Sequence, residues 1–281
     1  MTVNIIDAII NLVSTPVYSV GEYYNTHNRA NNMGSALEEY VKDIFAGTIS
    51  KTNQERLIRF QDVFSYLGNQ NNPPDFMIHG GAAVEVKKIE TNNSSLALNS
   101  SYPKAILKSS SSMITQACLD AEVWTQKDLI YAVGVVNESN VTRLSMVYGL
   151  DYAASSEIYT RIKAIIKDGV HVIEGVEFAE TNELGRINRV DPLGITYLRV
   201  RGMWGIQNPF EVFRYVYRPN ATASFNFFSL IEETKYNSFE NRERLEQLAT
   251  QNENLMITNV LIKTPDNPVV LKNAKLITYK R

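Results

Sequence analysis

The 281-residue sequence contains one cysteine and three histidines, and it has almost no excess charge of either sign. A lone Cys118 cannot form an internal disulfide, and the three separated histidines do not match a zinc-binding pattern. We therefore expect a protein of a reducing compartment, the cytoplasm. A formal net charge of −2 excludes a polycation that coats nucleic acid without discrimination, so any nucleic-acid site must be a local basic cleft.

The sequence also lacks a long apolar run. Asn4, Asp7 and Asn11 interrupt the apolar residues of the first segment, and no basic region precedes it, so we expect neither a signal peptide nor a membrane-spanning helix. A hydrophobic content of 44% and a charged content of 21% are typical of globular proteins. No repeat, linker or break in composition is visible, which predicts a single domain over residues 1–281.

The densest group of chemically useful residues lies in Asn71–Glu90, NNPPDFMIHGGAAVEVKKIE. Two apolar runs, 76–78 and 82–89, are separated by a Gly-Gly pair that permits a chain reversal, so the stretch predicts a β-hairpin. Glu85 and Lys87 are two residues apart and share one face of the second strand. Pairing of the strands would bring Asp75 beside Glu85.

Two carboxylates and one ammonium close together suit the hydrolysis of phosphodiesters. Asp75 and Glu85 would bind Mg²⁺, because this ion prefers hard carboxylate oxygens, and Lys87 would orient or deprotonate the attacking water. The alternative for Glu85 and Lys87 is an ordinary solvent-exposed ion pair. The preceding Pro-Asp dipeptide, the Gly-Gly reversal and the apolar flanks favour the catalytic interpretation.

The surrounding pattern predicts an α/β order. A helix over about Gly34–Phe45 places Glu38 at the flank of its apolar face and Glu39 toward solvent. Residues 54–67 fit either a helix or a strand, and the polar residues 91–101 are typical of an exposed loop. Residues 128–136 are apolar on both faces and predict a buried central strand, followed by a second strand over 142–148.

Further along, isoleucines at helical spacing predict a helix from Ser155 or Ser156 to Gly169 that covers the core. The aromatic-rich range Phe210–Phe228 predicts a hairpin with its turn at residues 219–220. A charged helix is expected over Ser238–Gln251, followed by strands in the tail Asn259–Arg281.

Two stretches carry residues suited to DNA. Lys104, Lys108 and Ser109 precede a predicted helix, whose start can hold a phosphate; the alternative is a helix N-cap in a flexible loop. Glu183–Asn208 concentrates arginines and amides, which can bond to guanine and adenine edges. Its candidate DNA-contacting residues are Arg186, Asn188, Arg189, Arg199, Arg201, Trp204 and Gln207. The alternative is that these arginines bind carboxylates of the protein itself.

The spacing Pro-Asp, nine residues, Glu-x-Lys resembles the PD-(D/E)xK nuclease motif. Together with NRVDPLGITYLRVRGMW, and supported by GSALEEYVKDIFAG and DLIYAVGVV, this stretch resembles type II restriction endonucleases of the NgoPII type. The resemblance implies an α/β fold, a restriction-endonuclease-like core whose central mixed sheet is flanked by helices. The core would span about 34–150 and the inserted DNA-recognition elements about 183–230. In such cores a helix ahead of the hairpin often adds an acidic residue, for which Glu38 is the candidate.

The resemblance further implies Mg²⁺-dependent cleavage of both strands of double-stranded DNA at a short palindrome, GGCC for the NgoPII type, and a cognate DNA methyltransferase as genetic partner. We expect cleavage to leave 5′-phosphate and 3′-hydroxyl ends. A palindrome needs two active sites related by a two-fold axis, so we expect a homodimer. The alternatives are a repair or recombination nuclease that recognises lesions or structures, and a non-catalytic DNA-binding protein with a nuclease-like fold.

Overall fold

The computed structural model describes residues 2–26, 32–69, 72–111, 113–181 and 183–281. Asn71, with which the predicted catalytic stretch begins, lies outside these ranges. None of the described helices is long and apolar enough to cross a membrane.

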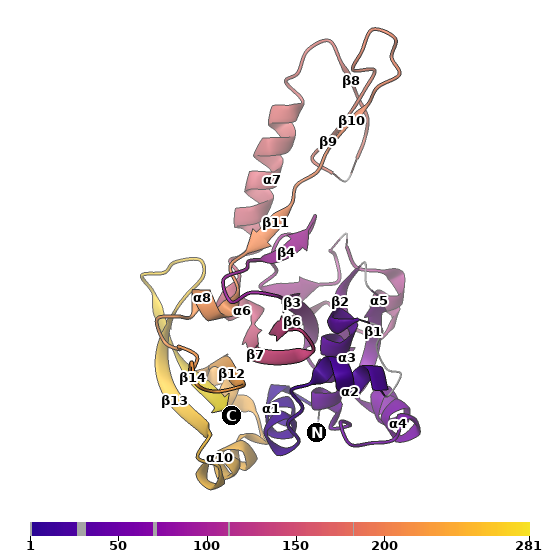
Figure 1. Cartoon of the computed structure of the whole chain (residues 1–281). Helices are drawn as coiled ribbons and strands as arrows, with labels where there is room; N and C mark the ends of the chain where they lie inside the picture. The colour runs from indigo at the N-terminus through magenta and orange to yellow at the C-terminus, as the bar shows by residue number, and fades with distance from the viewer. Residues whose placement is uncertain (1, 27–31, 70–71, 112, 182) are drawn as a thin grey trace.

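A mixed β-sheet forms the centre of the protein, in the order β1-β2-β3-β6-β7-β12-β14-β13 (Figure 1). β3 pairs with β6 and β7 with β12 in parallel, and the other neighbours on this path are antiparallel. The strands are β1 (Phe64–Asn69), β2 (Asn72–Ile78), β3 (Ala83–Ile89), β6 (Gln126–Asn137), β7 (Asn140–Tyr148), β12 (Asn226–Glu232), β13 (Leu255–Lys263) and β14 (Leu271–Lys280). A short strand, β5 (Ile106–Lys108), also pairs with β6.

The buried central strand predicted at 128–136 is β6. From Leu129 to Val136 every residue of this strand is buried. Ile130 and Ala132 point into one hydrophobic cluster, whereas Leu129 and Tyr131 point into a second cluster across the sheet. Burial on both faces explains why this strand is apolar throughout, since neither side of the pleat meets water.

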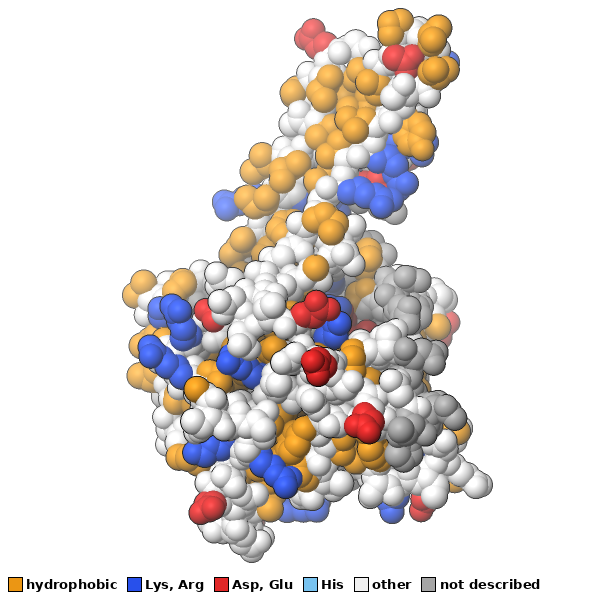
Figure 2. Space-filling view, in the orientation of Figure 1, with side chains coloured by type: hydrophobic (Ala, Val, Ile, Leu, Met, Phe, Trp, Pro, Cys, Tyr) orange, Lys and Arg blue, Asp and Glu red, His pale blue; other side chains and the backbone are white. Residues whose placement is uncertain are grey.

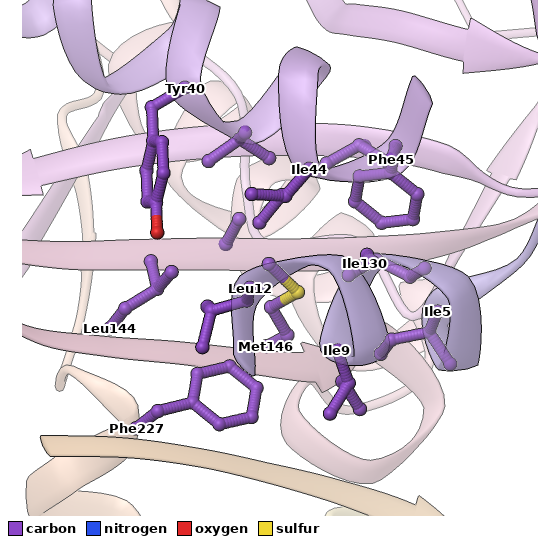
Figure 3. Packing of buried hydrophobic residues seen from close by; sticks show 14 of the residues in the cluster. Ile5, Ile9, Leu12, Tyr40, Ile44, Phe45, Ile130, Leu144, Met146 and Phe227 are labelled. Atoms are coloured by element: carbon purple, nitrogen blue, oxygen red, sulfur yellow. The ribbon is translucent and has the colours of Figure 1, made fainter. Parts of the chain in front are cut away.

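Helices flank both faces of the sheet, as expected from the sequence. Residues of α1 and α3 pack together over the sheet in the larger cluster (Figure 3). That face carries α1 (Ile5–Ser14), α2 (Val20–Thr26), α3 (Met33–Ala46), α4 (Asn53–Val63), α9 (Glu233–Ser238) and α10 (Arg242–Gln251). The other carries three short helices, α5 (Gln116–Asp120), α6 (Gly149–Tyr152) and α8 (Pro209–Val212).

An arm projects from this body (Figure 1). It consists of α7 (Ser156–Val170) and a small sheet of β8 (Glu177–Phe178), β9 (Gly185–Asn188) and β10 (Leu198–Val200). At its base β11 (Trp204–Ile206) pairs with β4 (Leu96–Asn99). The prediction that α7 covers the core is wrong, because none of its residues is buried. Its isoleucines form an apolar face, but that face lies away from the sheet.

Other expectations are also corrected. The stretch 91–101 was predicted as a loop, but it contains β4. This strand forms because its backbone pairs with β11, which is far along the chain. The predicted hairpin over Phe210–Phe228 is instead α8, a series of turns and the start of β12. The predicted helix Ser238–Gln251 is divided between the end of α9 and α10. Residues 54–67 form both alternatives in turn, since α4 leads directly into β1.

A buried ionic network joins α3 to α4. Asp43 is fully buried and accepts hydrogen bonds from Tyr24 Oη at 2.6 Å and Arg56 Nε at 2.7 Å. Arg56 also pairs with Glu39, which in turn accepts a bond from Lys42 Nζ at 2.9 Å. The sequence predicted that Glu39 points to solvent. This prediction is wrong, because Glu39 points into the network. The network orients the helix that carries Glu38.

We expect Asp43→Ala to lower the free energy of unfolding by about 3–5 kcal/mol, because it leaves the Arg56 guanidinium buried and short of its partner. The matched control is Asp62→Ala, which removes an exposed partner of Arg59 on α4 and should cost less than about 1 kcal/mol. Equilibrium urea unfolding measures both. Equal losses would contradict the assigned role of the network.

Candidate active site

The predicted hairpin is formed by β2 and β3. Their register pairs Phe76 with Val84 and Met77 with Ala83, and both strands bury apolar residues on each side. This pairing carries Asp75 to the middle of β3, where its Oδ2 accepts a hydrogen bond from the Val86 backbone N–H at 2.6 Å. Asp75 and Glu85 are thereby brought together, as the sequence predicted.

The turn of the hairpin is tied to a neighbouring segment. The Lys127 ammonium donates to the carbonyl oxygens of Ile78 at 3.2 Å and Gly81 at 2.8 Å, and it pairs with Glu122. Glu122 also accepts the backbone N–H of Gly80 at 2.9 Å. These contacts hold both ends of the reversal. The sequence analysis missed them, because residues 122 and 127 are far from the hairpin along the chain.

Glu85 and Lys87 lie on the same face of β3. Lys87 Nζ is 2.6 Å from Glu85 Oε1, but the side chains are only 27% and 13% exposed. The pair is therefore no ordinary solvent-exposed ion pair. The other oxygen of the carboxylate, Glu85 Oε2, is buried and has no hydrogen-bond partner among the described residues.

The site brings two half-buried carboxyl groups close together. Burial, followed by the nearby Glu85 carboxylate, raises the pKa of Asp75 to about 8. Burial alone would lower the pKa of Lys87, but the Glu85 and Asp75 carboxylates outweigh it and raise that pKa. Lys87 pairs with only one of the two half-buried carboxylates, an arrangement that favours a further positive charge.

Glu38 lies at the edge of this group. Its Oε1 accepts a bond from Lys42 Nζ at 2.6 Å, and its charge contributes to the raised pKa values of Asp75 and Lys87. However, no three His, Cys, Asp or Glu side chains lie close enough, within the described part of the chain, to hold a metal ion by themselves. Glu38 is therefore close enough to influence the site electrostatically but is not grouped with its two carboxylates as a third ligand.

The residues present fit a hard divalent cation. Glu85 Oε2 is an unpartnered carboxylate oxygen, and Asp75 supplies a second carboxylate beside it. Mg²⁺ is commonly held by one or two protein carboxylates, with water and substrate phosphate completing its coordination. Two carboxylates are thus sufficient for this ion.

Lys104 lies beside Asp75 and Glu85. It lines the same cavity of about 250 Å³ as Asp75, Glu85 and Lys87. Tyr131 of β6 fixes its backbone, since the hydroxyl accepts from Lys104 N at 2.8 Å and lies 3.2 Å from Lys104 O. Burial lowers the pKa of the Lys104 ammonium more than Glu85 raises it. The sequence analysis predicted a phosphate contact here but not its position in the catalytic cavity.

A larger hollow of about 850 Å³ adjoins the cavity lined by Asp75 and Glu85 and extends to the base of the arm. Lys104 lines both, and Lys108 and Arg201 line the hollow. Ser109 does not line it, because its hydroxyl and N–H both bond to the Thr125 carbonyl. The helix predicted after it begins only at Gln116, so Ser109 does not lie at a helix start. Ser112, in the same serine run, lies outside the described residues.

The predicted DNA-contacting residues of the arm divide into groups. Arg199 donates two hydrogen bonds to Glu183, at 2.9 and 2.7 Å, and Arg201 donates one at 2.6 Å, so both exposed arginines are held side by side. Leu198 and Met203 are 49% and 71% exposed. This part of the chain forms two strands in different sheets, β10 and β11.

The remaining candidates lie farther apart. Arg186 stands over the Tyr197 ring on the exposed side of the small sheet, and Arg189 is 3.6 Å from Glu177. Asn188, half-buried on β9, pairs with Glu177 of β8. Trp204 packs edge-on against the rings of Tyr102 and Tyr159. The carbonyl of exposed Gln207 accepts the Tyr152 hydroxyl. Of the predicted DNA-contacting residues, the structure therefore gathers Arg201, Trp204, Lys104 and Lys108 around the hollow.

The sequence matches a known family. The family model of the NgoPII restriction endonuclease matches residues 3–263. The chain belongs to the NgoPII restriction endonuclease family. The type II restriction enzyme NgoPII of Neisseria gonorrhoeae is 56% identical over 277 residues, which cover 98% of this chain and 99% of that relative. No solved structure matches this member of the NgoPII family.

For this NgoPII-family protein, the raised pKa of Asp75 predicts how stability depends on pH. The folded protein retains a proton up to about pH 8, whereas the unfolded chain releases it near the ordinary value of 3.8. The contribution of Asp75 to stability is therefore fully present below about pH 4 and is lost as the pH rises through about 8. Asp75→Asn should remove this decline.

The measurement is urea unfolding between about pH 5 and pH 9 with a chelator present. Asp62→Asn, an exposed carboxylate on α4, should keep the wild-type slope. A slope that is unchanged in Asp75→Asn would show that Asp75 is not the group responsible.

Proposed function

We propose that this protein is a type II restriction endonuclease that hydrolyses both strands of double-stranded DNA at a short palindrome. Membership of the NgoPII family supports the activity. The observation that carries the proposal is the half-buried group of Asp75, Glu85 and Lys87, which lines a cavity adjoining a larger hollow. The resemblance to NgoPII-type enzymes implies GGCC as the target, and a PD-(D/E)xK core as the catalytic fold.

The catalytic roles follow from the contacts of each side chain. Asp75 and Glu85 would hold Mg²⁺, with Glu85 Oε2 offering an oxygen that the protein does not use. When bound, Mg²⁺ supplies positive charge that stabilises the phosphate as its bonds change. Lys87, held beside Glu85, orients the attacking water and donates hydrogen bonds to the phosphate. In-line attack would leave 5′-phosphate and 3′-hydroxyl ends.

The DNA would occupy the hollow between the body and the arm. Lys104, where the hollow meets the catalytic cavity, would bind the scissile phosphate or its neighbour. Arg201 and Lys108 would contact the backbone or base edges beyond it. The exposed Arg186, Arg189 and Arg199 of the arm would extend this contact along the duplex.

A palindromic target would require two copies of this site, one for each strand, so we propose a homodimer. A restriction enzyme that acts in the cytoplasm would also cut the DNA of its own cell. We therefore propose that a cognate DNA methyltransferase protects the host, as a genetic partner and not as a stable complex.

The first test is digestion of unmethylated phage DNA by the purified protein with Mg²⁺, followed by sequencing of the fragment ends. We expect discrete fragments that share GGCC. Lys87→Ala should slow cleavage by roughly 10²-fold or more, since it removes a donor to the reacting phosphate. The matched control is Lys88→Ala, which removes the neighbouring, solvent-side lysine and should cut normally.

Three results would overturn parts of the proposal. Discrete fragments with another shared palindrome would reject GGCC but keep the restriction activity. Cleavage only at lesions or branched structures would identify a structure-directed nuclease. Normal cleavage by Lys87→Ala would show that the assigned site is wrong.

Lys104 and Lys108 provide a second matched pair. We expect Lys104→Ala to lower the single-turnover cleavage rate on bound DNA by about 10- to 100-fold, because this ammonium lies within the catalytic cavity. Lys108→Ala should change the affinity and its salt dependence but not that rate, because Lys108 lies outside the cavity. Equal effects on affinity alone would make both residues simple phosphate clamps.

A further inference from the structure

Helix α7 presents an apolar face to solvent. None of its 15 residues is buried. Ile158, Ile162, Ile165 and Ile166 are 40%, 39%, 61% and 44% exposed. In the space-filling view, hydrophobic side chains cluster along the arm (Figure 2). A helix on a monomeric protein normally turns such a face toward its own core, so this one marks a surface that another molecule covers.

The exposed residues form a regular seam. Ile158, Ile162, Ile165 and Gly169 are spaced by four, three and four residues, which places them in one line along the helix. A Cβ atom added at Gly169 would meet nothing within 4 Å. The seam thus carries three bulky side chains and ends at a small residue with open space above it. This is the pattern by which one helix packs against another.

The rest of the chain contacts α7 beside this seam and not on it. Tyr159 stacks on Tyr102 at a ring distance of 5.3 Å and meets the edge of Trp204, which anchors the start of the helix. Near its end, Val170 packs over Gly185 of β9. Tyr159 and Val170 lie on one flank of the helix. The seam is left uncovered by the described residues.

We propose that the seam of α7 binds the same seam of a second copy of this chain, with the two helices antiparallel about a two-fold axis. In this arrangement Ile162 packs against Ile165 of the second copy, and Ile158 packs over Gly169 of the second copy. The same contacts recur on the other side of the axis, as an isologous interface requires. Every bulky residue of the seam then has a complementary partner.

The charges beside the seam favour this direction. Arg161 and Asp168 flank the seam on the same side, both are exposed, and neither forms an ion pair within the described residues. Antiparallel pairing sets Arg161 against Asp168 of the second copy, twice per dimer. Parallel pairing would set Arg161 against an apolar Ile166. DNA is a poorer occupant, because the seam residues themselves carry no cation.

The inference rests on the proposed dimer and specifies its interface. Sedimentation velocity without DNA or metal separates it from the cleavage activity. We expect wild-type protein to sediment as a dimer, and Ile162→Lys and Ile165→Lys to sediment as monomers. Both side chains are exposed, so circular dichroism and thermal unfolding should show intact variants.

A charge exchange provides the sharper test. Arg161→Asp and Asp168→Arg should each weaken dimerisation by about tenfold, since each places like charges together twice, and the double variant should restore it. Lys167→Glu, a charge reversal on the opposite side of the same helix, should change nothing.

Three outcomes would overturn the interface. They are a wild-type monomer at every concentration, a dimer that survives Ile165→Lys, and a double variant no better than the singles. If cleavage at a palindrome persists in any of these cases, the interface is wrong while the proposed endonuclease stands. Discrete dimers without any cleavage would instead reject the activity and keep the interface.

Discussion

The register between β2 and β3 is the constraint on which the candidate site depends. A slip of one residue would turn Glu85 and Lys87 to the other face of the strand and bury Val84 and Val86 where the charges now lie. Apolar burial on both sides of the hairpin opposes that slip. Parallel pairing of β3 with the fully buried β6 fixes its depth in the sheet. Hydrophobic packing of the strands therefore brings the two carboxylates together, and the bonds to the Val86 N–H and to Lys87 hold their side chains.

Bringing these two carboxylates together is electrostatically unfavourable, and the rest of the fold must offset this. Burial, followed by the nearby Glu85 carboxylate, raises the pKa of Asp75. The ionic network around Asp43 differs, because every charge in it has a close partner of opposite sign. The body thus contains a compensated network that holds α3 in place, next to an uncompensated group facing a cavity. An uncompensated group of this kind is what a bound cation and a phosphate would complete.

Sequence patterns predicted the local parts of this structure well. The hairpin, the buried strand β6 and helix α3 are each specified by residues that are neighbours along the chain, so their periodicity is visible directly. Contacts between distant segments were not predictable in this way. From the sequence, Glu39 was predicted to be a surface residue, because its partner Arg56 lies on the next helix. The segment of β4 was predicted to be a loop, because its partner strand β11 is far along the chain. Lys104 was predicted as a candidate phosphate contact, but its place beside Glu85 depends on Tyr131 of β6.

The arm shows a second limit of such patterns. Isoleucines at helical spacing predict an apolar face, but they do not say whether the same chain or another molecule covers it. The structure shows that the described part of the chain does not cover this face, because the face lies away from the sheet. The arm also carries Arg199 and Arg201, paired with Glu183, near the hollow. If a second copy covers α7, the arginines of both arms become fixed relative to one another. Dimerisation and the spacing of DNA contacts would then be set by the same rigid element, as recognition of a palindrome requires.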